Sequence, residues 1–398
     1  MAKTKKVPEI RFKRFTEEWE EKLLGEIGIT QSGIGFPDSE QGECEGVPFF
    51  KVSDMNNKGN ENEMQNANNY VTNDQITRRR WKPITQVPAV IFAKVGAALM
   101  LNRKRLVRKP FLLDNNSMAY IFDTSWTADF GKMLFETINL PSYAQLGALP
   151  SYNGTDIESI LIHLPLNKEE QSNIGTLFQN LDTLIALRQR KHEKLLAVKK
   201  SMLEKMFPKE GADVPEIRFK GFTGKWERKK ISEIFKATRG YVLAFPDTSA
   251  KKTDENPYPV YSSQTKENGL MGFYKKYLYD TAITWTTDGA NAGTVNFRKG
   301  KFYCTNVCGV LISSEGYANA MVAESLNLIA WKHVSKVGNP KLMNNVMSEI
   351  ILTLPITIEE QTRIAAFFQN INSLIAHQKR ELDKLKNIKK ACLEKMFV

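Results

Sequence analysis

Residues 164–207 read LPLNKEEQSNIGTLFQNLDTLIALRQRKHEKLLAVKKSMLEKMF, and residues 354–397 read LPITIEEQTRIAAFFQNINSLIAHQKRELDKLKNIKKACLEKMF. About half of the aligned positions are identical. A second pair of segments, 7–27 and 214–234, shares 14 of 21 positions. The offset between the copies falls from 207 to 190, so the material between the repeated parts is 17 residues shorter in the second copy. The chain therefore contains two copies of one plan, with similar ends and divergent middles.

Each repeated ending predicts a long helix. Between Leu166 and Phe207 there is no Pro and one Gly, Gly175, and Asn167 followed by Glu170 is typical of a helix start with a capping box. Apolar residues spaced by three and four predict a narrow seam, which favours an antiparallel coiled coil of the two copies over a long helix inside one globular domain. The predicted seam consists of Ile174, Leu177, Leu181, Leu184, Leu195, Val198, Ile364, Phe367, Ile371, Leu374, Leu385 and Ile388.

The divergent middles predict a mixed α/β structure. Strand-like runs are found at 49–56 and 88–101 in the first middle, and the second is rich in short β-type runs with one helix expected at 323–334. Neither middle alternates strands with long helices, which argues against a doubly wound nucleotide-binding fold. We expect a domain at 1–163, a long helix at 164–208, a second domain at 209–353 and a second long helix at 354–398, related by a pseudo-twofold repeat.

Charge and cysteine content suggest a partner and a compartment. The 398 residues include 56 Lys and Arg against 44 Asp and Glu, a formal net charge of +12, so a polyanion is the first partner to consider. Residues 1–10 lead into Pro8 and Glu9 and not into an apolar segment, and we expect no signal peptide and no membrane span. Four cysteines without a CxxC pair fit reduced thiols in a cytoplasm.

Motifs for catalysis are missing from the sequence. There is no P-loop, and the four His residues lack the neighbours that a triad or a zinc site needs. Cys304 and Cys308 lie in a strand-like run and are expected to be inert core thiols. We therefore predict no catalytic residue and no metal site in this chain.

Basic clusters are the better candidates for function. Several lie in the divergent middles beside aromatic residues, a composition that suits contacts with phosphate groups. The candidate phosphate contacts are Lys51, Arg78, Arg79, Arg80, Lys94, Arg103, Lys104, Arg105, Arg108, Lys252, Lys275, Lys276, Arg298, Lys299 and Lys301. The two middles occupy the same position in their copies and yet differ in sequence. Two domains that read two different nucleic-acid sequences would need such a difference.

The repeated motifs resemble those of the specificity subunit of type I restriction-modification enzymes. The resemblance is carried by the Leu-Pro-x-x-x-Glu-Glu-Gln helix starts at 164 and 354 and by the Arg-Phe-x-x-Phe-Thr-x-x-Trp opening of both halves. Further segments of this kind are Lys51–Met55, Tyr152–Ile157, Tyr258–Ser263 and Thr287–Thr294. The resemblance covers essentially the whole chain.

The resemblance implies a protein without catalytic activity of its own. In that family two target recognition domains each read half of a split site in double-stranded DNA, and antiparallel helices set the gap between them. Two methyltransferase subunits dock on this frame, and motor-nuclease subunits join the larger assembly. S-adenosylmethionine, ATP and Mg are then expected on the partner subunits, adenine is the expected target of methylation, and no cofactor is expected on this chain.

Two other classes of function stay open at the level of sequence. One is a free-standing nuclease or methyltransferase, which the missing motifs disfavour. The other is a coiled-coil DNA-binding scaffold or regulator without modification partners, which would share the charge and the helices. Association with a methyltransferase distinguishes it from a specificity subunit.

Overall fold

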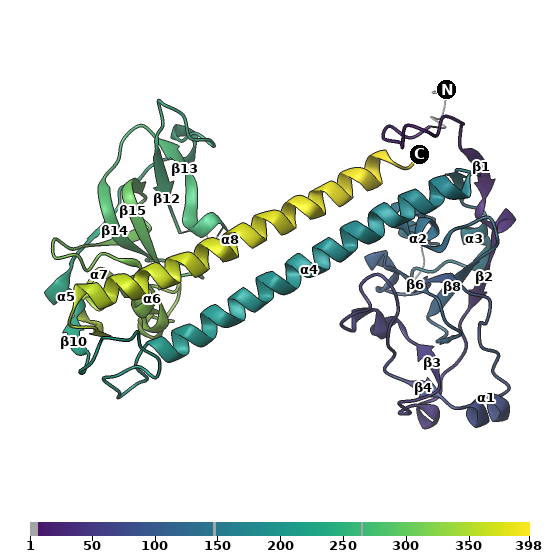
Figure 1. The fold of residues 1–398 in the computed structure, drawn as a ribbon, viewed down its shortest axis with the longest axis horizontal. Helices are drawn as coiled ribbons and strands as arrows, with labels where there is room; N and C mark the ends of the chain where they lie inside the picture. Colours follow the sequence, from purple (N-terminus) through teal and green to yellow (C-terminus); the bar gives the residue numbers. More distant parts are fainter. Residues whose placement is uncertain (1–6, 146–148, 264–265) are drawn as a thin grey trace. The chain divides into compact units, whose positions relative to one another are not determined.

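The computed structural model describes residues 7–145, 149–263 and 266–398 and divides the chain into two compact units. The first unit comprises Met1–Arg188 together with Glu381–Val398, and the second comprises Gln189–Arg380. Each unit therefore contains one divergent middle and a segment of both long helices (Figure 1). The mixed α/β fold class predicted from the sequence is confirmed.

The first unit is built around a four-stranded antiparallel sheet with the order β2-β8-β5-β6. A three-stranded sheet, β4-β3-β7, and a two-stranded sheet, β1-β9, complete it. The strands are β1 (Glu20–Leu23), β2 (Gly28–Ser32), β3 (Val47–Phe50), β4 (Tyr70–Val71), β5 (Ala89–Ala93), β6 (Lys104–Val107), β7 (Leu112–Leu113), β8 (Ser117–Phe122) and β9 (Leu161–Leu164). The short helices are α1 (Asn73–Arg79), α2 (Ala128–Thr137) and α3 (Gly154–Glu158).

The second unit contains a six-stranded sheet with the order β11-β16-β14-β15-β12-β13 and the pair β10-β17. Its strands are β10 (Glu227–Lys230), β11 (Lys236–Arg239), β12 (Tyr258–Tyr261), β13 (Leu270–Tyr274), β14 (Tyr279–Thr286), β15 (Val295–Cys304), β16 (Cys308–Ile312) and β17 (Ile351–Leu354). Its short helices are α5 (Ile231–Ile234), α6 (Ala320–Ile329) and α7 (Asn344–Glu349). Four strands, β11-β16-β14-β15, repeat the order of β2-β8-β5-β6, so the divergent middles share one antiparallel frame.

Alternating side chains pack against both faces of these frames. In β8, Tyr120 and Phe122 contact the larger core with α2, whereas Ala119 and Ile121 face a smaller core on the other side. In the second unit, Ile283 and Trp285 of β14 belong to the core under α6, and Ala282 lies in a smaller cluster with both Cys304 and Cys308. The two thiols are buried, as the sequence predicted.

The repeated motifs explain how each long helix begins. In the first unit Arg11 donates two hydrogen bonds to the buried Glu170, at 2.6 and 2.8 Å, and in the second Arg218 does the same to Glu360, at 2.6 and 2.7 Å. The expected capping role of Glu170 is therefore wrong, because this carboxylate turns inward to Arg11 while Asn167 accepts a hydrogen bond from the backbone of Glu169.

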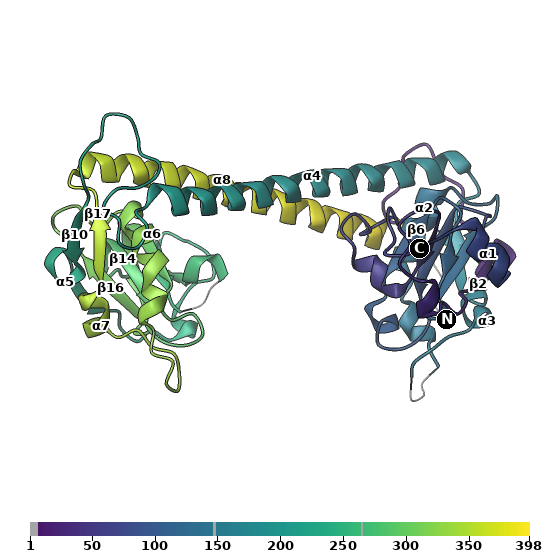
Figure 2. The same ribbon diagram turned by 90° about the horizontal axis from the view of Figure 1, so that it is seen from below.

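The two long helices are α4 (Lys168–Met206) and α8 (Ile358–Lys395), 39 and 38 residues long. In the first unit the start of α4 packs against the end of α8, where Lys389 forms an ion pair with Asp182 at 2.5 Å. In the second unit the end of α4 packs against the start of α8, and the rings of Phe207 and Phe368 lie 5.7 Å apart. The helix segments are antiparallel within each unit, as predicted (Figures 1 and 2).

The predicted seam is correct at some positions and displaced at others. Ile174, Leu181, Ile364 and Ile371 are buried, Leu195 and Leu385 are partly buried, and Leu177 and Phe367 are partly buried against the cores. The prediction is wrong at four positions that are 38–49% exposed, namely Leu184, Val198, Leu374 and Ile388. The next large apolar residue that is buried after Ile174 is Phe178, and the next after Ile364 is Phe368, a spacing of four residues in both helices. The later inward-facing residues are shifted in consequence. They include Ile185 and Ile375, each one position after the residue that the sequence predicted.

Candidate nucleic-acid interface

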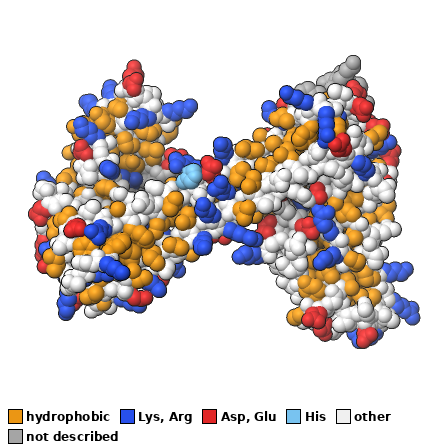
Figure 3. All heavy atoms as spheres, in the orientation of Figure 1, with side chains coloured by type: hydrophobic (Ala, Val, Ile, Leu, Met, Phe, Trp, Pro, Cys, Tyr) orange, Lys and Arg blue, Asp and Glu red, His pale blue; other side chains and the backbone are white. Residues whose placement is uncertain are grey.

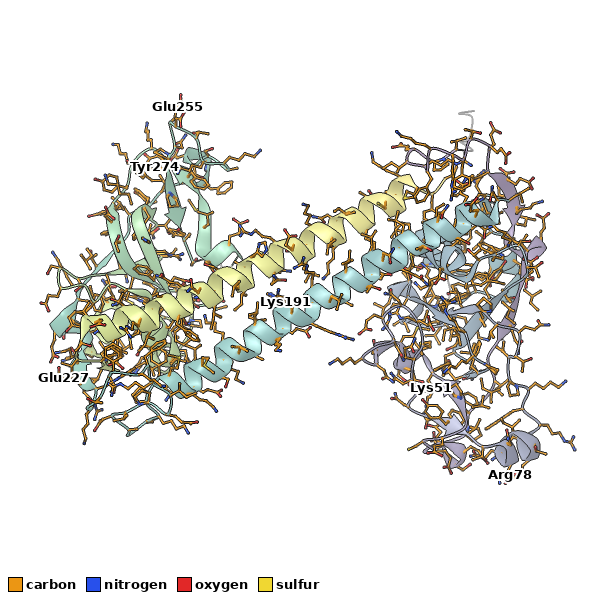
Figure 4. All side chains as sticks on the ribbon, in the orientation of Figure 1. Lys51, Arg78, Lys191, Glu227, Glu255 and Tyr274 are labelled. Atoms are coloured by element: carbon orange, nitrogen blue, oxygen red, sulfur yellow. The ribbon has the colours of Figure 1, made fainter. Side chains whose placement is uncertain are left out.

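Helix α1 presents an arginine cluster at one end of the first unit. Arg78 and Arg79 both donate hydrogen bonds to the carboxylate of Glu40, which is itself 4% exposed. The guanidinium of Arg79 is the main reason that the pKa of Glu40 is lowered. The side chain of Arg78, labelled in Figure 4, is 63% exposed and that of Arg79 is 40% exposed. Arg80 is exposed as well. These three cations outnumber the two neighbouring acids, Glu40 and Asp74 of the same helix, and the net positive surface can contact phosphate.

The second basic cluster of the first unit is mostly engaged inside the protein. Lys104 is buried at 1% exposure and donates to the carbonyl of Ile138 at 2.7 Å, so its prediction as a phosphate contact is wrong. Burial lowers the pKa of Lys104 to about 8. Arg105 is partly buried and donates to the carbonyls of Lys104 and Met55, at 2.9 and 3.5 Å.

The remaining cations of this unit have polar neighbours. Arg108 pairs with Glu63 at 3.0 Å and with Asp129, which reduces its availability for phosphate. Arg103 donates to Asn56, and Lys51 donates to Gln41 at 3.1 Å. Lys94 is partly buried directly after β5.

In the second unit, Arg298 is also a structural residue. It is 7% exposed, lies 3.7 Å from the ring centre of Tyr261, and donates to Thr284 Oγ1 at 3.1 Å and to the carbonyl of Asn268 at 2.6 Å. Burial lowers the pKa of its guanidinium. Its prediction as a phosphate contact is therefore wrong, because its charge is directed into the sheet and not to the surface.

The other predicted cations of the second unit lie on its surface. Lys252, Lys275, Lys276, Lys299 and Lys301 are exposed. The ammonium of Lys301 lies 4.6 Å from the ring centre of Tyr277, whose ring packs 5.0 Å from that of Tyr258. Figure 3 shows Lys and Arg side chains around an apolar area over β12 and β13, and Figure 4 places Tyr274 at this end. Lysines among tyrosines can neutralise phosphate and pack against sugars or bases.

A protruding hairpin was missed by the sequence analysis. In the second unit Ser335 and Lys341 pair through both backbone hydrogen bonds, at 2.8 and 3.1 Å, and the loop between them extends beyond the sheet (Figure 2). In the first unit Gln145 and Ser151 form a bridge at an offset of 190 residues, the offset of the long-helix repeat, and the backbone of Gln145 donates to the carbonyl of Ser151 at 2.8 Å. That shared offset, together with Pro150 and Pro340 inside the two loops, was the available signal.

The described part of the chain shows neither a metal-binding cluster nor a helix that could span a membrane. Within residues 7–145, 149–263 and 266–398, no group of three or more His, Cys, Asp or Glu side chains could hold a metal ion. Among these same residues, no helix is both long enough and apolar enough to cross a bilayer.

A family model matches both halves of the chain. The model describes the type I restriction modification DNA specificity domain, and its two matches span residues 16–197 and 223–387. Each match contains one divergent middle and most of the long helix that follows it.

Curated relatives come from Mycoplasma pneumoniae. A protein described as a type I specificity subunit is 40% identical over 136 residues, which are 33% of this chain and 37% of that protein. A second, with the same description, is 30% identical over 216 residues, which are 52% of this chain and 82% of that protein. The chain thus spans little more than a third of the first relative and most of the second.

Solved structures share the fold. The S subunit of a type I restriction-modification system from Mycoplasma genitalium aligns over 98% of this chain and 99% of its own, with a TM-score of 0.67 and 15% identity. A chain from a structural study of the assembly and conformational transition of a type I system aligns over 95% of this chain and 97% of its own, with a TM-score of 0.50 and 16% identity.

Proposed function

Since the chain belongs to the type I restriction-modification DNA specificity family, we propose that it is the DNA-recognition subunit of such a system and catalyses no reaction itself. The observation that carries the proposal is the common sheet frame with unlike additions. The first unit adds β3, β4, β7 and α1 to the frame, whereas the second adds β12 and β13. A shared frame with different additions suits two readers of two different half-sites.

The distribution of charge supports double-stranded DNA as the ligand. Arg78, Arg79 and Arg80 lie on the addition of the first unit. The exposed lysines of the second unit lie in the segments next to β12 and β13 and on β15, the frame strand that pairs with β12. Phosphate contacts from such residues orient a protein on the duplex without reading its sequence. Sequence discrimination then depends on other side chains of each unit.

Two methyltransferase subunits are the partners that we propose for the helices. Leu184 and Ile388 are exposed apolar residues of the first unit. In the second unit the counterpart of Leu184 is Leu374 and that of Ile388 is Val198, and both are exposed. Each immediately precedes an inward-facing position of its helix. Apolar side chains in the same positions of both copies suit two equivalent docking surfaces.

The wider assembly follows from the same proposal. Motor-nuclease subunits would join the complex, and S-adenosylmethionine, ATP and Mg would bind to the partner subunits. The methylated base would be adenine, and the complex would act in the cytoplasm.

Co-expression with the methyltransferase subunit of the same system tests the proposal. We expect the two proteins to co-purify and the complex to methylate one split DNA sequence that neither protein modifies alone. DNA binding by the chain without any association with the methyltransferase would contradict the proposal and favour a coiled-coil regulator. Methylation by the purified chain alone would contradict its non-catalytic role.

A further inference from the structure

We infer that the hairpin Ser335–Lys341 enters the major groove and reads bases of the half-site bound by the second unit, with Lys336 and Val337 as its specificity-determining residues. The inference rests on the proposed function and adds to it the element and the residues that discriminate between sequences.

The base of the hairpin is held firmly. Besides the pairing of Ser335 with Lys341, the backbone of Gly289 donates to the carbonyl of Pro340 at 2.9 Å, and that of Leu342 donates to the carbonyl of Thr287 at 2.9 Å. The buried indole of Trp285 donates to the carbonyl of Leu342 at 3.0 Å. A central strand of the sheet thus fixes where the hairpin leaves the unit, as a reading element requires.

The tip carries side chains that make no contribution to the core. Val337 is 91% exposed, the highest value among the exposed large apolar side chains of the described residues, and Lys336 beside it is exposed too. Gly338 has a φ of +70°, a left-handed conformation that lets the chain turn at this point. An apolar side chain held in water on a fixed protrusion suits contact with a partner.

The chemistry of the tip matches base edges in the major groove. The methyl group of thymine makes apolar contacts there, and guanine presents O6 and N7 acceptors to a lysine ammonium. A two-stranded ribbon fits within the groove, which is about 12 Å wide. Val337 and Lys336 therefore offer one apolar and one charged contact, whereas the ammonium of Lys341 at the base lies 3.9 Å from the carboxylate of Asp288.

The first unit repeats the anchoring but not the residues. Gly96 donates to the carbonyl of Pro150 at 2.9 Å, as Gly289 does to Pro340, and the sequences QLGALPS and SKVGNPK differ at six of seven positions. Leu149 is 66% exposed, and residues 146–148 lie outside the described part of the chain. The same anchoring in both units with two different sequences is what the recognition of two unlike half-sites needs.

Selection from randomised DNA tests the inference. The complex of the chain with its methyltransferase would be used to select DNA in which both half-sites are randomised, for the unchanged protein, Lys336→Ala and Val337→Ser. We expect each variant to lose about tenfold to a hundredfold discrimination at one base position of one half-site, with the other half-site unchanged. Because both side chains are exposed, the thermal unfolding midpoint should stay the same. Lys225→Ala, at a lysine 79% exposed in the opening segment of the second copy, is the matched control and should leave every preference unchanged.

Two outcomes would overturn the inference alone. Unchanged preferences in both hairpin variants would show that this element does not read bases. An equal loss of affinity for every sequence would make Lys336 a phosphate contact. If the unchanged complex selects no split sequence at all, the proposed function fails, and the inference fails with it.

Discussion

At the scale of single residues, the buried ion pairs Arg11–Glu170 and Arg218–Glu360 account for the strongest sequence repeat. Glu170 and Glu360 are fully or almost fully buried, and each accepts two hydrogen bonds from its arginine. A carboxylate removed from water in this way requires its partner, since an unpaired buried charge is strongly destabilising. This requirement explains why the Arg-Phe opening and the Glu-Glu-Gln helix start occur together in both copies.

Removal of one partner should expose this dependence. We predict that Arg218→Met lowers the free energy of unfolding by about 3 kcal/mol or more, because Glu360 is left buried without a counter-charge. Urea denaturation followed by tryptophan fluorescence would measure the loss. Arg363→Met breaks the exposed pair with Glu359 and should cost less than about 1 kcal/mol. Equal effects of the two substitutions would contradict the assignment.

Lys104 should give the protein a pH-dependent stability. Burial lowers the pKa of Lys104 to about 8, from 10.5 for an ordinary lysine, while the charge of Glu136 raises it and that of Lys132 lowers it by smaller amounts. Between pH 8 and 10.5 the unfolded chain binds more protons at this site than the folded one, so the folded state is stabilised as the pH rises through this range. Below pH 8 the ammonium is buried in its charged form and this gain is absent.

A comparison with Lys104→Met isolates this effect. We predict that the stability of the unchanged protein, relative to the variant, increases from pH 7.5 to pH 9.5. Thermal or urea unfolding at both values would measure it. A difference in stability that stays constant over this range would contradict the lowered pKa.

Part of the residue-level picture was accessible from the sequence and part was not. Lys104 and Leu106 alternate in a strand and thus share a face, which already indicates that Lys104 points towards the core. For Arg298 no local signal existed, because its partners Tyr261 and Asn268 come from distant parts of the chain. The predicted clusters of basic residues therefore included structural cations, Lys104 and Arg298, beside exposed ones.

At the scale of elements, the long helices followed directly from the sequence, whereas the seam did not. Their length and antiparallel packing depend on a repeated apolar spacing that is local. The choice between a step of three and a step of four after Ile174 depends on the partner helix, and Leu177 and Phe178 both offer an apolar side chain. The consequence is that Leu184, Val198, Leu374 and Ile388 are surface residues available for a partner.

Two substitutions at Leu184 separate helix integrity from docking. Leu184→Pro should cost about 3 kcal/mol or more, because proline removes a backbone hydrogen bond inside α4. Leu184→Asp keeps the helix, since this position is 45% exposed, but should abolish co-purification with the methyltransferase. Circular dichroism measures the first effect and a pull-down measures the second. Retained assembly in Leu184→Asp would contradict the proposed docking surface.

The common sheet frame could not be derived from the sequence. Its strands pair over long separations, as β2 does with β8 and β11 with β16, and their sequences have diverged. The position and pairing of such short strands depend on which side chains are buried on the two faces of the sheet, and not on a local sequence pattern. Because the strands added to the frame differ in the two units, the strand order that they share could not be recognised from the sequence.

At the scale of the whole molecule, the chain closes its first unit with its own C-terminal segment. Met396 belongs to the core of that unit, and the ring of Phe397 packs 6.1 Å from that of Trp19 and 5.6 Å from that of Phe130. We predict that deletion of residues 381–398 increases amide hydrogen exchange in β5 and β8 and leaves β14 and β16 protected. Equal protection of both sheets would contradict this division into units.

In the proposed function, each unit reads its own half of a split DNA site. Mapping of methylated motifs in cells tests it most directly, with the unchanged protein and with a chain whose residues 235–353 come from another member of the family. We expect that one half of the methylated motif changes while the other half and the gap are retained. A motif that changes in both halves, or in neither, would contradict it.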